Sequence, residues 1–192
     1  MRGECDVVVG LVLHFRTPER TLTCLRSLAD EGIGEVVLVD NSEDAGRSIE
    51  AMQSGLARLA DAGLRVEVLQ PARNLGFSAG VGMGLEHVSR NQRASVLLLN
   101  SDAMLERGAL AAMINSLRDA ACIALPARSS SGASPSPSIV FYQRLLALYL
   151  RRSSAGALRY PSGCCLLIRA DQVRPDLFDK DFFFYGEDVM LG

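Results

Sequence analysis

The amino-acid sequence predicts an α/β fold with a mostly parallel sheet and helices on both faces. Several short runs are continuously apolar and rich in β-branched residues, which is typical of strands buried on both faces. Segments with helical periodicity alternate with these runs, and such alternation favours parallel strands joined by helices. The 192 residues, 48% of them hydrophobic and 22% charged, are enough for one globular domain with a substantial core.

The first strand is expected at residues 7–13, where the chain reads V-V-V-G-L-V-L. A helix then begins at Thr17, because Thr can cap it, Pro18 suits the first helical position and Glu19 favours the positive end of the dipole. Further strands are expected at residues 35–39, 64–69, 94–99, 122–125 and 162–168. Further helices are expected at residues 49–62, 79–90, 106–120 and 139–152.

The composition changes after Pro126. Residues 128–138 are rich in Ser, Pro and Gly and predict a mobile loop. The helix expected at residues 139–152 has an apolar face, made by Ile139, Tyr142, Leu145, Leu146 and Tyr149. This face fits either a membrane surface or a protein surface, the latter in this domain or in a second subunit of a homodimer. Three basic residues are available to anionic lipid in the first case: Arg144, Arg151 and Arg152.

Charge and cysteine usage exclude several classes of protein. The net charge of -2 gives no basic field that would attract nucleic acid. The five cysteines form no C-x-x-C pair, and only two histidines could help them bind zinc. The first fifteen residues lack the features of a secretory signal, and no apolar run approaches the ~18 residues of a membrane span. We therefore expect a cytoplasmic protein with reduced thiols, either free or attached to the inner face of the cytoplasmic membrane.

Asp40, Asn41 and Ser42 come directly after the strand predicted at residues 35–39. Ligands of such folds bind at the carboxyl ends of the strands, and an acid there can accept from a nucleobase N–H or a ribose hydroxyl. The same residue types are also common in helix caps and turns. This cluster alone leaves both interpretations open.

A second cluster, R-N-L-G-F-S-A-G, runs from Arg73 to Gly80. Its glycines permit close backbone approach, and a helix beginning there can turn its free N–H groups toward an anion. Arg73 could add a charge-assisted contact to phosphate. An ordinary connection between a strand and a helix would have a similar sequence.

Asn100, Ser101 and Asp102 follow the strand predicted at residues 94–99. A carboxylate at the end of a buried strand can bind a divalent cation that bridges two phosphates, although a capped turn is the other interpretation. Glu187 and Asp188 follow three consecutive phenylalanines, and an acid beside apolar rings can serve as a general base.

The order of these motifs resembles that of the family 2 glycosyltransferases with the GT-A fold, closest to their rhamnosyltransferase-like branch. V-D-N-S, R-N-L-G-F-S-A-G, L-L-L-N-S-D, G-C-C-L-L-I-R and F-D-K-D-F-F-F-Y-G-E-D-V follow one another over nearly the whole chain. The chain departs from the family pattern at four places. His14-Phe15-Arg16 stands where N-Y-N is often found, and Gly82 stands where an Asn is common. Ser101 stands where Pro is usual, and Met190 replaces the second acid of D-V-D-L.

The resemblance implies one GT-A-like domain over residues 1–192. Residues 1–125 would be the nucleotide-binding half, and residues 126–192 an acceptor-side half that stops short of the helices with which family members continue. Asp40 would contact the base, Asp102 would bind Mg²⁺ or Mn²⁺, and Asp188 would be the general base, with Glu187 orienting it or the acceptor. The other residues implied at the nucleotide-sugar site are His14, Arg16, Asn41, Ser42, Arg73, Asn74, Gly76, Asn100, Ser101 and Gly163. His14 could instead be a hydrogen-bonded structural residue rather than a contact to the diphosphate.

The activity implied by the resemblance is inverting transfer of a sugar from dTDP-rhamnose or a UDP-sugar to a hydroxyl. The acceptor would be a glycan or a lipid-linked sugar in cell-surface polysaccharide or glycolipid synthesis. A catalytically silent member that binds a nucleotide or a partner is the second interpretation, motivated by Met190 and the shortened end. A nucleotidyltransferase is disfavoured because no glycine-rich basic loop follows the first strand, and a dehydrogenase because G-x-G-x-x-G is missing there.

Overall fold

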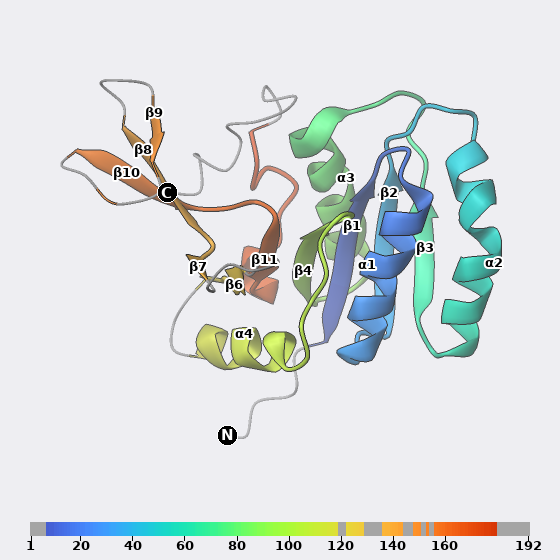
Figure 1. Ribbon diagram of the computed structural model, residues 1–192, viewed down its shortest axis with the longest axis horizontal. Coiled ribbons are helices and arrows are strands. Elements are labelled where there is room, and N and C mark those ends of the chain that lie inside the picture. Colours follow the sequence, from blue (N-terminus) through green and yellow to red (C-terminus); the bar gives the residue numbers. More distant parts are fainter. Residues whose placement is uncertain are drawn as a thin grey trace.

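The computed structural model describes residues 7–118, 122–128, 136–143, 148–150, 153 and 156–179. Its main sheet has six strands in the order β3-β2-β1-β4-β11-β5 (Figure 1). Four neighbours are parallel: β3 (Arg65–Leu69), β2 (Glu35–Asp40), β1 (Val8–His14) and β4 (Ser95–Asn100). β11 (Cys165–Ile168) runs antiparallel to both β4 and β5 (Ile123–Ala124). The prediction of a mostly parallel α/β sheet is confirmed.

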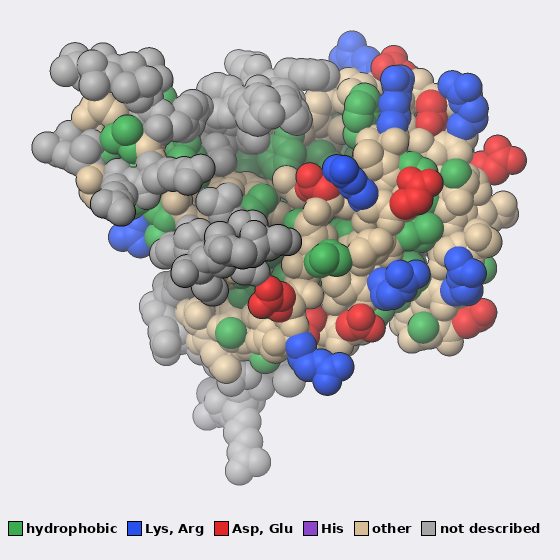
Figure 2. Space-filling view, in the orientation of Figure 1, with side chains coloured by type: hydrophobic (Ala, Val, Ile, Leu, Met, Phe, Trp, Pro, Cys, Tyr) green, Lys and Arg blue, Asp and Glu red, His purple; other side chains and the backbone are tan. Residues whose placement is uncertain are grey.

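Helices cover both faces of this sheet, as predicted. α1 (Pro18–Asp30), α2 (Arg47–Asp61) and α4 (Ala109–Arg118) share one apolar core with one face of the strands. α3 (Gly76–Asn91) and Phe178, which follows the short helix η1 (Ala170–Gln172), bury the opposite face. Figure 2 shows acidic and basic side chains interspersed over the outer surface of α1 and α2.

The register of the parallel strands brings their carboxyl ends to one edge. His14 at the end of β1 lies beside Asp40 at the end of β2, and Leu13 lies beside Asn100 at the end of β4. The segments at residues 40–42 and 100–102 therefore leave the sheet on either side of the end of β1. Because adjacent strands lie about 4.8 Å apart, the ends of β2 and β4 are about 10 Å from each other.

The prediction of a helix at residues 139–152 is wrong. β8 (Ile139–Gln143), β9 (Leu148–Leu150) and β10 (Ala157–Pro161) form a three-stranded antiparallel sheet that stands apart from the main sheet (Figure 1). The run I-V-F-Y consists of β-branched and aromatic residues, which favour strands, and its pairing with β10 decides the outcome. The amphipathic helix proposed for a membrane therefore has no counterpart, and its three arginines lie outside the described side chains.

Other differences are smaller. The ends of the loop predicted at residues 128–138 pair as β6 (Ala127–Arg128) and β7 (Ser136–Pro137). α3 begins three residues earlier than predicted, at Gly76, and α4 begins three residues later, at Ala109. Within the described residues, no helix has both the length and the apolar character needed to span a bilayer.

Candidate functional site

The loop after β1 and the loop after β2 are joined at the carboxyl edge of the sheet. The backbone N–H of Arg16 donates to Ser42 Oγ at 3.0 Å, and Arg16 Nε donates to the Ser42 carbonyl at 2.9 Å. The Arg16 guanidinium also lies 5.1 Å from the centre of the exposed Phe15 ring. Arg16, Glu43 and Ala45 have φ values of 52°, 51° and 58°, in the left-handed region that non-glycine residues seldom adopt.

Asp40 is 4% exposed beneath this contact. Its Oδ1 accepts the N–H of Ser42 at 3.0 Å, and its Oδ2 accepts from Gln70 Nε2 at 3.1 Å. Both bonds orient the carboxylate, and each oxygen keeps a lone pair for another donor. Gln70 has no signal in the sequence, because it acts from the end of the neighbouring strand β3.

Asn41 connects the end of β2 to the start of α3. Its Nδ2 donates to the Gly76 carbonyl at 2.8 Å, and its backbone N–H donates to the His14 carbonyl at 2.8 Å. Asn74 Oδ1 accepts the Gly76 N–H at 2.9 Å, and Gly76 has a φ of 74°. A Cβ on Gly80 would lie 2.9 Å from Asn41 Nδ2, so this glycine lets the helix approach Asn41. These residues shape the start of α3, which has no side-chain cap, and Arg73 before it is exposed.

Asn100, Ser101 and Asp102 form a turn at the end of β4, where the Ala103 N–H donates to the Asn100 carbonyl at 3.0 Å. Asp102 is exposed at this turn. On the other side of β4, the Asn100 N–H donates to the Cys164 carbonyl at 2.9 Å, which brings the buried Gly163 next to the same turn.

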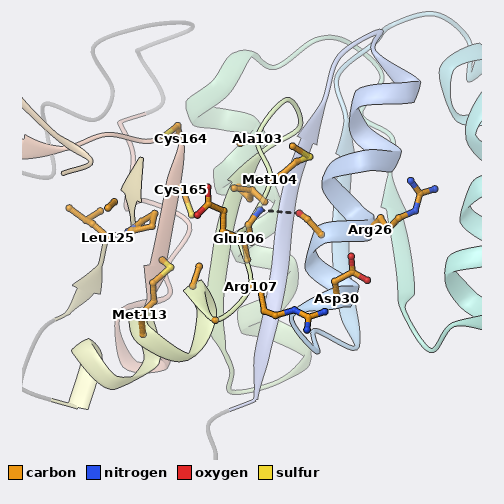
Figure 3. Close-up of a pocket in the computed structure, with 18 of the residues that line it drawn as sticks. Arg26, Asp30, Ala103, Met104, Glu106, Arg107, Met113, Leu125, Cys164 and Cys165 are labelled. Carbon is orange, nitrogen blue, oxygen red and sulfur yellow. Dashed lines mark hydrogen bonds between the residues drawn. The ribbon is translucent and has the colours of Figure 1, made fainter. Parts of the chain in front are cut away.

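α1 holds the segment that follows Asp102. The Leu105 N–H donates to Ser27 Oγ at 3.1 Å, drawn as the dashed line in Figure 3. The Gly108 N–H donates to Glu31 Oε1 at 2.7 Å, and the Leu110 N–H donates to Glu31 Oε2 at 3.0 Å. Glu31 therefore caps α4 from a different helix. Sequence reasoning missed both Ser27 and Glu31, because their partners lie more than 75 residues away.

The segment after Asp102 lines an open cleft of about 1200 Å³ (Figure 3). α1 contributes Arg26 and Asp30 to its lining, α4 contributes Met113, and the start of β11 contributes Cys164 and Cys165. Burial raises the pKa of the Cys165 thiol to about 12, and the neighbouring Cys164 adds to the effect. Cys165 is 4% exposed and packs in the apolar core.

Asp102 fits one mode of cation binding. Among the described residues, no three His, Cys, Asp or Glu side chains gather into a group that could hold a metal ion. Mg²⁺ is commonly held by one or two carboxylates together with substrate phosphates and waters, and a single exposed carboxylate at the strand edge suits that mode. Glu187 and Asp188, expected to carry the catalytic chemistry, lie outside the described residues.

His14 is fully buried at the end of β1. Its Nδ1 lies 2.7 Å from Thr21 Oγ1 of α1, and its Nε2 has no hydrogen-bond partner among the described residues. Burial lowers the pKa of His14 below its ordinary value, and this outweighs the opposing effect of the Asp40 and Asp44 carboxylates. The hydrogen bond of Nδ1 to Thr21 is consistent with a structural role for this histidine, and it does not account for Nε2.

Comparisons with known proteins agree with the motif order. The sequence profile of glycosyl transferase family 2 matches residues 11–174. No protein of curated function is significantly similar in sequence. Similar solved structures include S. aureus TarS, residues 1–349, at 17% identity and a TM-score of 0.59, with 96% of this chain and 53% of that chain covered. GalNAc-T7 with UDP, GalNAc and Mn²⁺ shows 13% identity and a TM-score of 0.68, with 96% and 39% covered.

A third similar structure is the 4-diphosphocytidyl-2C-methyl-D-erythritol synthase of Anaerococcus prevotii, at 10% identity and a TM-score of 0.55. The similarity covers 88% of this chain and 73% of that chain. At such identities the likeness concerns the fold alone, which is the GT-A type that the motif order implied. This chain spans about half of TarS and less of GalNAc-T7.

Proposed function

Because this chain belongs to glycosyl transferase family 2, we propose that its domain transfers a sugar from a nucleoside diphosphate sugar to an acceptor hydroxyl. The observation that carries the proposal is the shared edge of the sheet, where Asp40 ends β2 and Asp102 follows β4. A nucleotide spanning this edge would meet an acceptor of hydrogen bonds at one end and a cation ligand at the other.

Different residues of this chain would bind different parts of the donor. Asp40, oriented by Ser42 and Gln70, would accept from the base. Asn74 accepts the Gly76 N–H, so the N–H groups of the first turn of α3 beyond Gly76 would face the diphosphate. Asp102 would hold Mg²⁺ or Mn²⁺, which supplies positive charge to the leaving diphosphate. The Mn²⁺ and UDP found with the structurally similar GalNAc-T7 support this choice of ligands.

Asp188 would take the proton from the acceptor hydroxyl as it attacks the anomeric carbon, and Glu187 would orient it or the acceptor. General base catalysis of this kind contributes about 10²–10⁴-fold to the rate. A single base without a covalent intermediate predicts inversion at the anomeric carbon. We further propose dTDP-rhamnose or a UDP-sugar as donor, and a glycan or lipid-linked acceptor of cell-surface polymers reached from the cytoplasm.

Calorimetry with UDP, dTDP, GDP, CDP and ADP, with and without Mn²⁺, tests the binding part of the proposal. One diphosphate should bind, and Asp102→Asn should abolish the gain in affinity that Mn²⁺ gives. Asp61→Asn, at the exposed end of α2, is the matched control and should bind like the unsubstituted protein. If none of the five diphosphates binds, the proposal is wrong.

Turnover tests the catalytic part. Release of the nucleoside diphosphate from its sugar should require an acceptor and should fall at least 100-fold in Asp188→Asn. Binding without turnover against any acceptor would favour the catalytically silent interpretation, in which Met190 marks a changed catalytic segment.

The similarity to 4-diphosphocytidyl-2C-methyl-D-erythritol synthase does not favour nucleotidyl transfer here. Only residues 15–17 separate β1 from α1, they include no glycine, and Pro18 already begins the helix. The reaction product also separates the two activities, because nucleotidyl transfer to a sugar phosphate releases inorganic diphosphate. Detecting that product instead of a nucleoside diphosphate would refute the glycosyltransferase proposal.

A further inference from the structure

Unpartnered polar atoms gather near the proposed donor site. Among the described residues, four buried side-chain atoms have no hydrogen-bond partner: His14 Nε2, Asp44 Oδ1, Ser78 Oγ and Ser138 Oγ. The first three belong to the end of β1, the loop after β2 and the first turn of α3. Buried polar atoms are nearly always hydrogen-bonded, so their concentration at one edge indicates that a ligand or water completes them.

The hydrogen bonds around Thr21 favour one tautomer of His14. When Thr21 Oγ1 donates its only hydrogen to the Thr17 carbonyl at 3.0 Å, its oxygen accepts at the 2.7 Å contact with the ring. His14 Nδ1 carries the proton in that arrangement. A neutral ring with Nδ1–H has a bare lone pair on Nε2, and burial of the ring favours that neutral form.

The charged groups that act on this ring, Asp40 and Asp44, are both carboxylates. Asp40 lies beside His14 in the strand register. Asp44 uses Oδ2 to accept from the Ser48 N–H and the Ser48 hydroxyl, at 3.1 and 2.6 Å, and leaves Oδ1 buried without a partner. Nε2 and these carboxylates all accept hydrogen bonds. What they need is a donor, and an ionised diphosphate has only acceptors to offer.

We propose that His14 Nε2 and Asp44 Oδ1 accept hydrogen bonds from the nucleoside part of the donor, a base N–H or a ribose hydroxyl, and not from its diphosphate. His14 then helps to select the donor nucleotide, which revises the expected contact to the diphosphate. The inference rests on the proposed function, since it needs a nucleotide at this edge.

His14 Nε2 is buried, so a ligand reaches it only when neighbouring residues move. The contact between Arg16 and Ser42 joins the loops after β1 and β2, and two of its neighbours, Glu43 and Ala45, hold left-handed backbone conformations. Such conformations are unfavourable for L-residues. Rearrangement of the contact between Arg16 and Ser42 would admit the nucleoside.

Two substitutions of His14 test the contributions of its two ring nitrogens separately. In His14→Asn the amide can replace Nδ1 toward Thr21 but does not extend to the position of Nε2. In His14→Gln the longer side chain can return an acceptor to that position. The affinities of both variants are measured by calorimetry with Mg²⁺, for the tightest binder among UDP, dTDP, GDP, CDP and ADP and for inorganic diphosphate.

His14→Asn should weaken nucleoside diphosphate binding about tenfold and leave inorganic diphosphate unchanged, because one buried donor of the ligand loses its acceptor. His14→Gln should recover part of the loss. Equal losses for both ligands would overturn the inference, and unchanged binding in His14→Asn would mean that only water meets Nε2. If the unsubstituted protein binds no nucleotide, the proposed function fails instead.

The pair Thr21→Val and Thr21→Ser repeats the test should His14→Asn not fold. Valine removes the acceptor of Nδ1–H, so the ring proton is no longer held on Nδ1. The affinity for the nucleoside diphosphate should then fall, while the affinity for inorganic diphosphate stays unchanged. Serine keeps the hydroxyl and should bind like threonine. Equal affinities for the valine and serine variants would contradict the assigned tautomer.

Discussion

Replacing Glu31 with alanine should loosen the start of α4 and the segment that carries Asp102. Glu31 accepts the N–H groups of Gly108 and Leu110, which no other side chain is seen to satisfy among the described residues. Loss of a capping side chain destabilises a protein by about 0.5–2 kcal/mol, and loss of a negative charge at a helix N-terminus adds about 0.3–1 kcal/mol. Since Glu31 is half-buried, we expect the free energy of unfolding to fall by about 1.5 kcal/mol.

Urea unfolding monitored by circular dichroism measures this change in free energy. In thermal unfolding the melting temperature should fall by about 3–6 °C. Glu86→Ala is the control, because its pair with Arg90 on α3 is exposed and worth only about 0.3–0.5 kcal/mol. Glu31→Ala should also reduce the Mn²⁺-dependent part of nucleotide binding, and Glu86→Ala should not. The reasoning is refuted if the two variants unfold at the same urea concentration.

Three further predictions follow from packing, thiol burial and protonation. Gly84→Ala should lower the free energy of unfolding by about 1–2 kcal/mol, because its Cβ would lie 2.2 Å from Leu11 Cδ1; a neutral result would contradict the close approach of α3 to β1. Iodoacetamide at pH 8 should label exposed Cys122 in the native protein but spare Cys24, whose pKa burial raises to about 12; mass spectrometry would expose the error if Cys24 reacted equally fast. Burial lowers the pKa of His14 below 6.5, so the unfolded chain binds more protons than the folded protein just below that pH. The free energy of unfolding should therefore fall as the pH is lowered. Urea unfolding at a series of pH values measures this dependence on pH, which should be lost in His14→Asn.

The strands of the main sheet could be predicted from the sequence because strands buried on both faces appear as continuous apolar runs. A strand covered on both faces, such as β1 or β4, has no polar alternation, and the observed bounds differ from the prediction by a residue at either end. Strands β8 and β10 of the small sheet are not buried on both faces in this way. In β8 all five residues are half-buried, so the pattern there resembled a helix with one apolar face.

The candidate site could be predicted only as far as local chemistry allowed. Asp40 and Asp102 could be found because each follows a buried strand, and the structure brings both strand ends to one edge. Gln70, Thr21 and Glu31 could not be found, since each acts through a hydrogen bond to a residue on another element. Such partners depend on the three-dimensional packing of helices and strands, which periodicity does not encode.

The position of β11 affects how the protein can be made. This strand lies between β4 and β5, although the whole small sheet separates it from β5 along the chain. A growing polypeptide therefore cannot complete its main sheet until residues 165–168 have left the ribosome. Until then β4 presents an edge of unpaired backbone groups, which invites association with other chains. A fragment ending at residue 125 would keep that edge of β4 open, because it lacks β11.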